Sequence, residues 1–490
     1  MKKINITNGA ATDTLFLFLV QVITTVMGMA VTKLLSVYFT LDEYGLYSQV
    51  MLVSTTVTSL SILGLTNATN YFYNSSKNEK NQKEYVSTIF AIQLVVGLFC
   101  GLAIIFLRKN ISMYFQNENL KNMLFIIALN PMFVNLMNMY QTLYVSIGEA
   151  KKIALRNFAV AILRMAAVII ACFVVKNIVV MVMAITIMDV VQVLYFSILF
   201  KKIKFSISIK YMNIHLIKEI LYFSIPMAVY VLTNSLSRDL DKYVISAFTD
   251  TETLAVYSNA SKVLPFDLVT TSLITVLIPI ITRQIHKPDY KAAENTFKIY
   301  LRTGYIITFI LVGGAIGLAN PLMRLLYDEK YLPGLSVFVI YLFVDMIRFA
   351  NVTTILSGAG KTRILMRISV CMLASNLVLN IIAYKALGII GPAITTLVLN
   401  ITMNLILLYY GAKEIHCKVY SLFDWKEMVI VGFEILVFAI MAHIVSKKLD
   451  LFNLPVFWVL AISYGIYIII MLGLNYKRIK KCYVDLNGCK

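Results

Sequence analysis

The sequence predicts an all-α integral membrane protein of about fourteen transmembrane helices, built as two parallel six-helix bundles with two further helices at the C-terminal end. Three observations predict this fold. Hydrophobic residues make up 59% of the 490 residues and charged residues only 14%. Apolar runs of membrane-spanning length recur from end to end, and two distant segments repeat at one common offset. A soluble domain has about 25% charged residues, so this composition excludes an ordinary soluble enzyme and a disordered chain.

The apolar runs set the number of helices, because about twenty residues at a rise of 1.5 Å cross the hydrocarbon of a bilayer. We expect helices over residues 13–37, 46–70, 85–107, 121–143, 155–175, 178–200, 219–247, 254–282, 299–323, 334–356, 365–386, 390–412, 427–446 and 453–474. The runs 121–143 and 219–247 are the least regular, because the first contains Asn130 and Pro131 and the second ends in a charged stretch.

The chain carries 44 Lys and Arg residues against 25 Asp and Glu residues, a net charge of +19. Such an excess can indicate a nucleic-acid-binding protein. Here the bases lie between the apolar runs, and the loops of one side hold roughly three times as many as those of the other. This asymmetry predicts that both termini are cytoplasmic, and it explains the charge without a nucleic acid. The six Cys and four His residues show no metal-ligand spacing, so we expect neither a metal nor another cofactor.

An internal repeat has an offset of 210 residues. Residues 39–48 align with 249–258, and residues 146–151 align with 356–361, including loop glycines and lysines. Six helices are an even number, so both copies have one orientation and are related by an axis along the membrane normal. The predicted domains are an N-terminal six-helix bundle (1–210), its repeat (211–412), and two additional helices with a basic cytoplasmic tail (413–490).

Four segments in the same order resemble the polysaccharide transport, or oligosaccharide flippase, family of the superfamily that also contains multidrug and toxin extruders and lipid II flippases. They are EYGLYS (Glu43–Ser48), the long stretch from SIPMAVYV to SNASKV (Ser224–Val263), LSGAGKTR (Leu356–Arg363) and LVLNIIAYKALGIIGPAITT (Leu377–Thr396). The resemblance covers essentially the whole chain. The first half departs from the pattern, because Val31 stands at the position equivalent to Asp241.

The resemblance implies a V-shaped pair of bundles around a central cavity and a location in the bacterial cytoplasmic membrane. It also implies a task, which is to move a polyprenyl-diphosphate-linked oligosaccharide between leaflets by alternating access. The expected partners are that lipid-linked glycan, membrane lipids, a coupling proton or sodium ion, and the glycan polymerase and glycosyltransferases. A flippase needs no nucleophile, so we expect no catalytic residues and no enzymatic activity.

The helix predicted over 219–247 contains the strongest candidates for substrate contact. Asn234, Arg238 and Asp241 are spaced i, i+4, i+7 and share a helix face. A charge at the bilayer centre costs about 2.5–3.5 kcal/mol, so such charges usually face a cavity or a partner. Arg238 could contact the diphosphate, with Asp241 orienting it or carrying a coupling proton. Alternatively, Arg238 and Asp241 pair with each other near the outer end of the helix.

Other intramembrane residues could take part as well. Lys262, placed inside the helix 254–282, and Lys33 could line the cavity, and Lys242 either lines it or extends its amine to the interface. Asp267 and Pro265 are candidates for a protonatable site and a hinge. A further set consists of buried-charge candidates: Arg164, Asp189, Asp345, Arg348 and Glu434, with Asp345 and Arg348 close enough to pair.

Two alternatives remain open. A cation-coupled multidrug exporter of the same superfamily would use paired acidic residues in one bundle, whereas bases in a cavity favour an anionic lipid head group. A membrane glycan polymerase or acyltransferase would need a large outside loop or an intramembrane His or Arg constellation, and the sequence shows neither.

Overall fold

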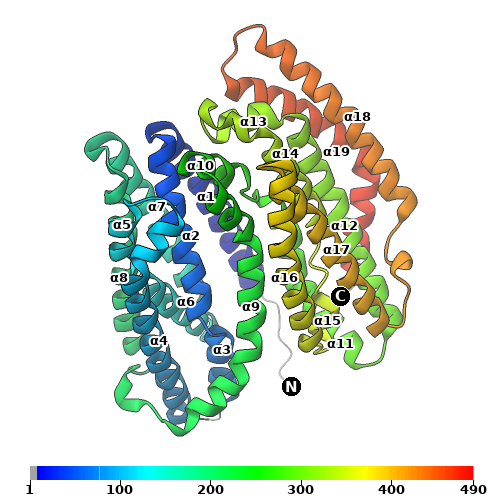
Figure 1. The fold of residues 1–490 in the computed structure, drawn as a ribbon. Helices are drawn as coiled ribbons and strands as arrows, with labels where there is room; N and C mark the ends of the chain where they lie inside the picture. Colours follow the sequence, from blue (N-terminus) through cyan, green and yellow to red (C-terminus); the bar gives the residue numbers. More distant parts are fainter. Residues whose placement is uncertain (1–7, 77, 489–490) are drawn as a thin grey trace. The chain divides into compact units, whose positions relative to one another are not determined.

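The computed structural model describes residues 8–76 and 78–488, and every regular element within them is helical. The chain divides into two compact units (Figure 1). The first unit contains Met1–Asp239 and Ser246–Ala255, and the second contains Leu240–Ile245 and Val256–Lys490. The division falls inside one long helix and again inside the short helix that follows it.

The first unit contains the helices from α1 to most of α9. They are α1 (Asn8–Tyr38), α2 (Leu41–Ser61), α3 (Leu65–Ser75), α4 (Glu79–Tyr114), α5 (Leu120–Ile127), α6 (Asn130–Ser146), α7 (Ala150–Ile169) continued by the π-helix η1 (Ile170–Val175), α8 (Ile178–Ile203), the 3₁₀ turn η2 (Ile209–Tyr211) and α9 (His215–Phe248). Side chains of α3, α4, α6 and α8 contribute most residues of one hydrophobic core cluster in this unit.

Two local features fix the beginning and the end of α2. Thr40 forms a capping box with Glu43, since the Thr40 side chain accepts from the Glu43 N–H and the Glu43 carboxylate accepts from the Thr40 N–H. Gly64 separates α2 from α3 with φ +66°, and a Cβ there would collide with the carbonyl oxygen of Ser224. Only glycine fits that position, because it alone adopts a left-handed conformation without steric cost.

The second unit holds the remaining helices, with α10 divided between the units. They are α10 (Thr251–Ala260), η3 (Pro265–Asp267), α11 (Leu268–His286), α12 (Tyr290–Gly317), α13 (Ala319–Leu326), η4 (Glu329–Gly334), α14 (Leu335–Ile347), α15 (Thr354–Gly358), α16 (Thr362–Leu387), α17 (Ile390–Glu414), η5 (Val419–Leu422), α18 (Trp425–Asp450) and α19 (Val456–Gly488).

Helices α12, α18 and α19 pack side by side in this unit (Figure 1). Their shared core includes Tyr305, Ile435 and Tyr467. Gly314 of α12 faces the rings of Tyr464 and Tyr467 so closely that a Cβ would overlap them. Small residues let helices approach closely in lipid, where dispersion contacts hold helices together. The two C-terminal helices are therefore bound tightly to α12.

Thirteen helical spans in the described residues are long and apolar enough to cross a membrane, which confirms an all-helical membrane protein. The prediction of one continuous helix over 254–282 is wrong. Its helix stops at Ala260, the backbone is irregular to Leu264, and helical structure resumes at Pro265. Proline has no N–H to donate and restricts the residue before it, so it favours a new helical start over a continued helix.

Helix boundaries recur at the offset found in the sequence. α1 ends at Tyr38 and α9 at Phe248, while α2 begins at Leu41 and α10 at Thr251. Both pairs differ by 210 positions. The second helix of each predicted half is also interrupted, as α2–α3 and as α10–α11.

Candidate functional site

A buried carboxylate lies where residues of α9, α10 and α14 that belong to the second unit meet. Asp241 is only 1% exposed. Its Oδ2 accepts hydrogen bonds from the Tyr257 hydroxyl (2.9 Å) on α10 and from the Tyr341 hydroxyl on α14. Its Oδ1 accepts from the backbone N–H of Lys242 at 2.8 Å. A buried charged or polar group is costly unless it is hydrogen-bonded, and these donors meet that requirement. We call Asp241, Tyr257 and Tyr341 the aspartate–tyrosine cluster.

The break between α10 and η3 lies close by in the sequence and is stabilised by polar side chains. The Lys262 amine donates to the Asn259 side-chain oxygen at 2.8 Å and lies 5.9 Å from the ring centroid of Tyr327. The backbone N–H of Leu264 donates to Asp345 Oδ2 at 2.9 Å. Irregular backbone at membrane depth needs such partners, because hydrocarbon offers none. Lys262 therefore lies in an irregular segment and not inside a helix as the sequence predicts.

The remaining candidates of α9 have different surroundings. Asn234 donates its side-chain N–H to the carbonyl of Tyr230 on its own helix at 2.8 Å. Arg238 is exposed, whereas Asp241 three residues later is buried, and Lys242 is half-buried. The three residues keep the predicted spacing along α9. The side chains that bind the Asp241 carboxylate are, however, those of Tyr257 and Tyr341.

The other predicted residues are distributed between the units. Lys33 is half-buried on α1 in the first unit. Pro265 begins η3 in the second unit, at the end of the helix break. The side chain of Asp267 lies outside the described residues. Of the six substrate-binding candidates, Asn234, Arg238 and Lys33 belong to the first unit, and the other three belong to the second.

Sequence reasoning missed the two tyrosines of the cluster, although one signal was present. Tyr257 is the repeat equivalent of Tyr47, at the offset of 210. In the first unit, the Tyr47 hydroxyl accepts from Arg164 of α7 at 3.2 Å. Each repeat tyrosine therefore binds a charged side chain inside its own unit, an arginine in one and an aspartate in the other.

The first unit also contains a chain of polar side chains that crosses four helices. Ser54 of α2 donates to Asn130 of α6 at 2.9 Å, and Asn130 donates to Asp189 of α8 at 2.5 Å. Gln192 donates weakly to Asp189 at 3.4 Å and accepts from the Arg156 Nε at 2.7 Å. The buried charge predicted at Asp189 is therefore stabilised by an amide and lies within a wider polar network.

Comparison with known proteins identifies the family. A family model described as "Polysaccharide biosynthesis protein" matches residues 17–336. A lipid II flippase MurJ in an inward closed conformation superposes with a TM-score of 0.76 at 16% identity, covering 95% of this chain and 99% of that one. An inward-facing multidrug resistance MATE family transporter of the MOP superfamily gives 0.65 at 12% identity, covering 80% and 94%.

A MOP superfamily transporter from Pyrococcus furiosus gives a TM-score of 0.59 at 13% identity, covering 82% of this chain and 94% of that one. No curated protein matches the chain. The structural matches show a shared fold, and the family model extends over well more than half of the sequence. This chain is therefore a multi-pass membrane protein that belongs to the polysaccharide biosynthesis protein family and has the MOP-superfamily fold.

Proposed function

We propose that this protein is a flippase that moves a polyprenyl-diphosphate-linked oligosaccharide across the bacterial cytoplasmic membrane by alternating access. The observation that carries the proposal is the helix break of the second unit, where Lys262, Asn259 and Asp345 are placed among apolar spans. A polar head group loses its hydrogen bonds to water in hydrocarbon and needs replacements along its path. The family to which the chain belongs and its fold are consistent with this role.

The proposed roles follow from charge and burial. Arg238 is exposed and Lys262 is placed by a neutral amide, so both cations are suited to contact an anionic diphosphate. Asp241 is buried, accepts hydrogen bonds from two tyrosine hydroxyls, and is suited to carry a coupling proton, with sodium as the other candidate ion. Asn234, Lys33 and Lys242 remain proposed lining residues, and Pro265 with Asp267 a proposed hinge. None of these roles requires a nucleophile, so we do not expect enzymatic activity.

The shared offset in helix boundaries supports the proposal that residues 1–210 and 211–412 arose by duplication. Helices α18 and α19 would then be later additions, although they now pack tightly on α12. An even number of helices per copy gives both halves one membrane orientation.

Replacing Arg238 with alanine tests the proposed diphosphate contact. We expect Arg238→Ala to reduce surface polysaccharide at least tenfold, because the variant lacks a cation that contacts the diphosphate. Arg238→Lys keeps the positive charge and should retain part of the polysaccharide. Arg238 is exposed, so the protein should still insert and accumulate. The readout is surface polysaccharide, with protein level measured in the same membranes. Lys109→Ala, another exposed base, serves as the control. Normal polysaccharide from Arg238→Ala would remove this residue from the mechanism.

Cysteine labelling tests the proposed orientation. By the positive-inside rule, the lysine-rich loops predict that residues 80 and 291 are cytoplasmic. We expect cysteines introduced at Lys80 and Lys291 to resist a membrane-impermeant maleimide in intact cells and to react after permeabilisation. A cysteine at Lys109, predicted outside, should react in intact cells. Rapid labelling of the first two positions in intact cells would show that the protein has the opposite orientation.

Drug export is the competing activity, and it can be measured in the strain used for the polysaccharide assay. A cation-coupled exporter would raise resistance to cationic dyes when the gene is overexpressed. We expect no change in resistance together with restored polysaccharide in a flippase-deficient host. Dye resistance without restored polysaccharide would contradict the proposed substrate.

A further inference from the structure

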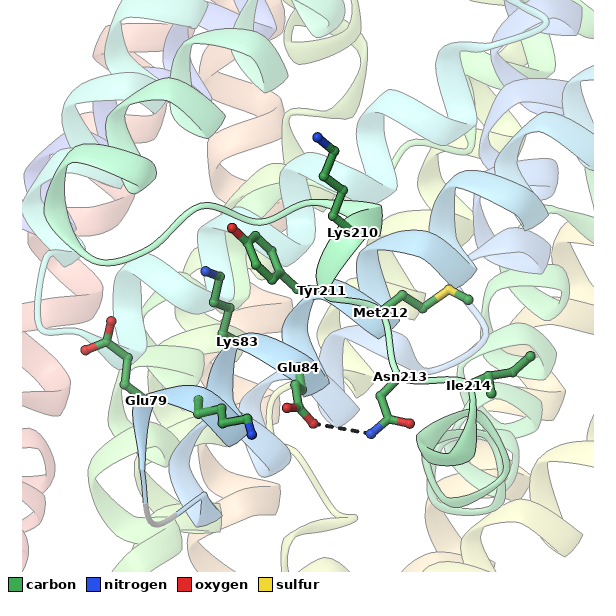
Figure 2. Close-up of a pocket in the computed structure, with 9 residues that line it drawn as sticks. Glu79, Lys83, Glu84, Lys210, Tyr211, Met212, Asn213 and Ile214 are labelled. Carbon is green, nitrogen blue, oxygen red and sulfur yellow. Dashed lines mark hydrogen bonds between the residues drawn. The ribbon is translucent and has the colours of Figure 1, made fainter.

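A polar pocket of about 740 Å³ lies in the first unit, between the beginning of α4 and the segment that joins α8 to α9 (Figure 2). Its lining contains three lysines, which we call the pocket lysines, two glutamates, and the four residues from Tyr211 to Ile214. The complete lining is Glu79, Lys80, Lys83, Glu84, Lys210, Tyr211, Met212, Asn213 and Ile214. None of these residues belongs to the candidate site described above.

Hydrogen bonds and one apolar anchor hold the joining segment on α4. Phe205 is buried against Phe200, with ring centroids 5.5 Å apart. The backbone N–H of Asn213 donates to the Thr88 hydroxyl at 3.0 Å, and its side chain donates to the Glu84 carboxylate at 3.3 Å. Figure 2 shows this last bond on one side of the pocket, with Lys83 beside Tyr211 on the other. These contacts therefore hold the joining segment, and with it the pocket, in a defined position against α4.

The position of these bonds along α4 places the pocket at the edge of the membrane. α4 has 36 residues, so it is about 54 Å long, against about 30 Å of hydrocarbon. Its predicted apolar run begins at residue 85, and the joining segment is bonded at Thr88. Lys80 and Lys83 come just before that run. This is the depth at which lipid head groups lie.

The chemistry of the lining suits an amphipathic anion. Lys80 and Lys210 are exposed, while the Lys83 amine lies 3.3 Å from the centroid of the Tyr211 ring. Three lysines against two glutamates leave the lining with a net positive charge, and one of the glutamates, Glu84, is engaged by the Asn213 amide. Apolar side chains extend outward beside them, with Ile209 56% and Ile214 65% exposed. Bases next to exposed apolar groups are typical of interfacial segments that bind anionic lipids.

We propose that this pocket binds the phosphate head group of an anionic phospholipid, with Lys80 and Lys210 at the phosphate and with Met212 and Ile214 against the acyl chains. The exposed apolar side chains favour a bulk membrane lipid as the occupant, because at head-group depth they would lie against its acyl chains. Binding would fix the segment between α8 and α9 to the membrane surface. The proposal rests on the membrane orientation proposed above.

Native mass spectrometry of the full-length protein in detergent, stripped of lipid, tests the proposal. The probes are dioctanoyl phosphatidylglycerol, dioctanoyl phosphatidylcholine and inorganic phosphate. A test variant replaces the three pocket lysines with glutamine, and Lys210→Glu serves as a second variant should the triple variant unfold. The control variant replaces three exposed lysines of the same stretch outside the pocket, namely Lys201, Lys202 and Lys218.

We expect phosphatidylglycerol to bind at least tenfold more tightly than phosphatidylcholine. The test variant should lose at least tenfold in phosphatidylglycerol affinity and the control variant less than threefold, because only pocket lysines contact the phosphate. An equal loss in the control would show diffuse attraction to a basic surface and overturn the pocket. Displacement by millimolar phosphate would identify a free-phosphate site, which also overturns the proposal. Binding to purified protein does not depend on transport, so a failure here leaves the flippase proposal untouched.

Discussion

We expect Asp241→Asn to reduce transport of a lipid-linked oligosaccharide at least a hundredfold while leaving the protein folded. Asparagine keeps one side-chain oxygen that can accept from the Tyr257 and Tyr341 hydroxyls, and it loses only the bond from the Lys242 N–H. It cannot gain or release a proton or hold a cation by charge. Transport into proteoliposomes, measured with and without an imposed proton gradient, is the readout. Retained transport that no longer responds to the gradient would also assign the coupling proton to Asp241.

A second pair of variants separates coupling from structure. Asp241→Ala removes the acceptor for two buried hydroxyls, and each unsatisfied hydroxyl costs about 1–3 kcal/mol. It should therefore lower the thermal unfolding temperature more than Asp241→Asn, which loses only the bond from the Lys242 N–H. Tyr341→Phe removes one donor and should have an intermediate effect. If Asp241→Asn transports at the normal rate and responds to the gradient as the wild type does, the aspartate has a structural role alone.

The sequence predicts most of the helices because each apolar span carries its own signal. The break at Ser261–Leu264 is local as well, and Pro265 marks it, yet the surrounding apolar residues favour one continuous helix. Its stabilising partner is not local. Asp345 lies 81 residues from Leu264 in the sequence, and only the packed structure brings its carboxylate to that N–H.

In the candidate site too, neighbouring residues predict some features, whereas residues distant in the sequence determine the others. Helix spacing predicts that Arg238 and Asp241 lie near each other, but it does not predict which of them is buried. Burial depends on which helices pack around Asp241, and the Tyr341 hydroxyl comes from 100 residues away. The internal repeat is the sequence signal with the longest range, because only its offset of 210 residues relates Tyr257 to Tyr47.

The largest expected effect on folding is at a buried ion pair between α12 and α18, which the sequence alone does not reveal. Arg302 of α12 is 9% exposed and binds the Glu427 carboxylate of α18 through two nitrogens, one of them Nε at 2.7 Å. Tyr305 donates to the same carboxylate at 3.0 Å. Removing one partner of a buried pair leaves an uncompensated charge, at a cost of about 3–5 kcal/mol. We therefore expect Arg302→Met to lower the thermal unfolding temperature of the purified protein strongly and to reduce its level in membranes.

Two comparisons distinguish this ion pair from a general effect of lost charge. Lys291→Met breaks a pair with Glu294, but the Lys291 side chain is 79% exposed, and exposed pairs contribute about 0–1 kcal/mol. The double variant Arg302→Met with Glu427→Met removes both charges and should recover part of the stability, because a buried pair can be replaced by apolar side chains of similar volume, whereas the Tyr305 hydroxyl loses its acceptor. If Arg302→Met unfolds no earlier than Lys291→Met, the contact between α12 and α18 depends on the apolar core around Gly313 and Ile435, and the ion pair adds little to it.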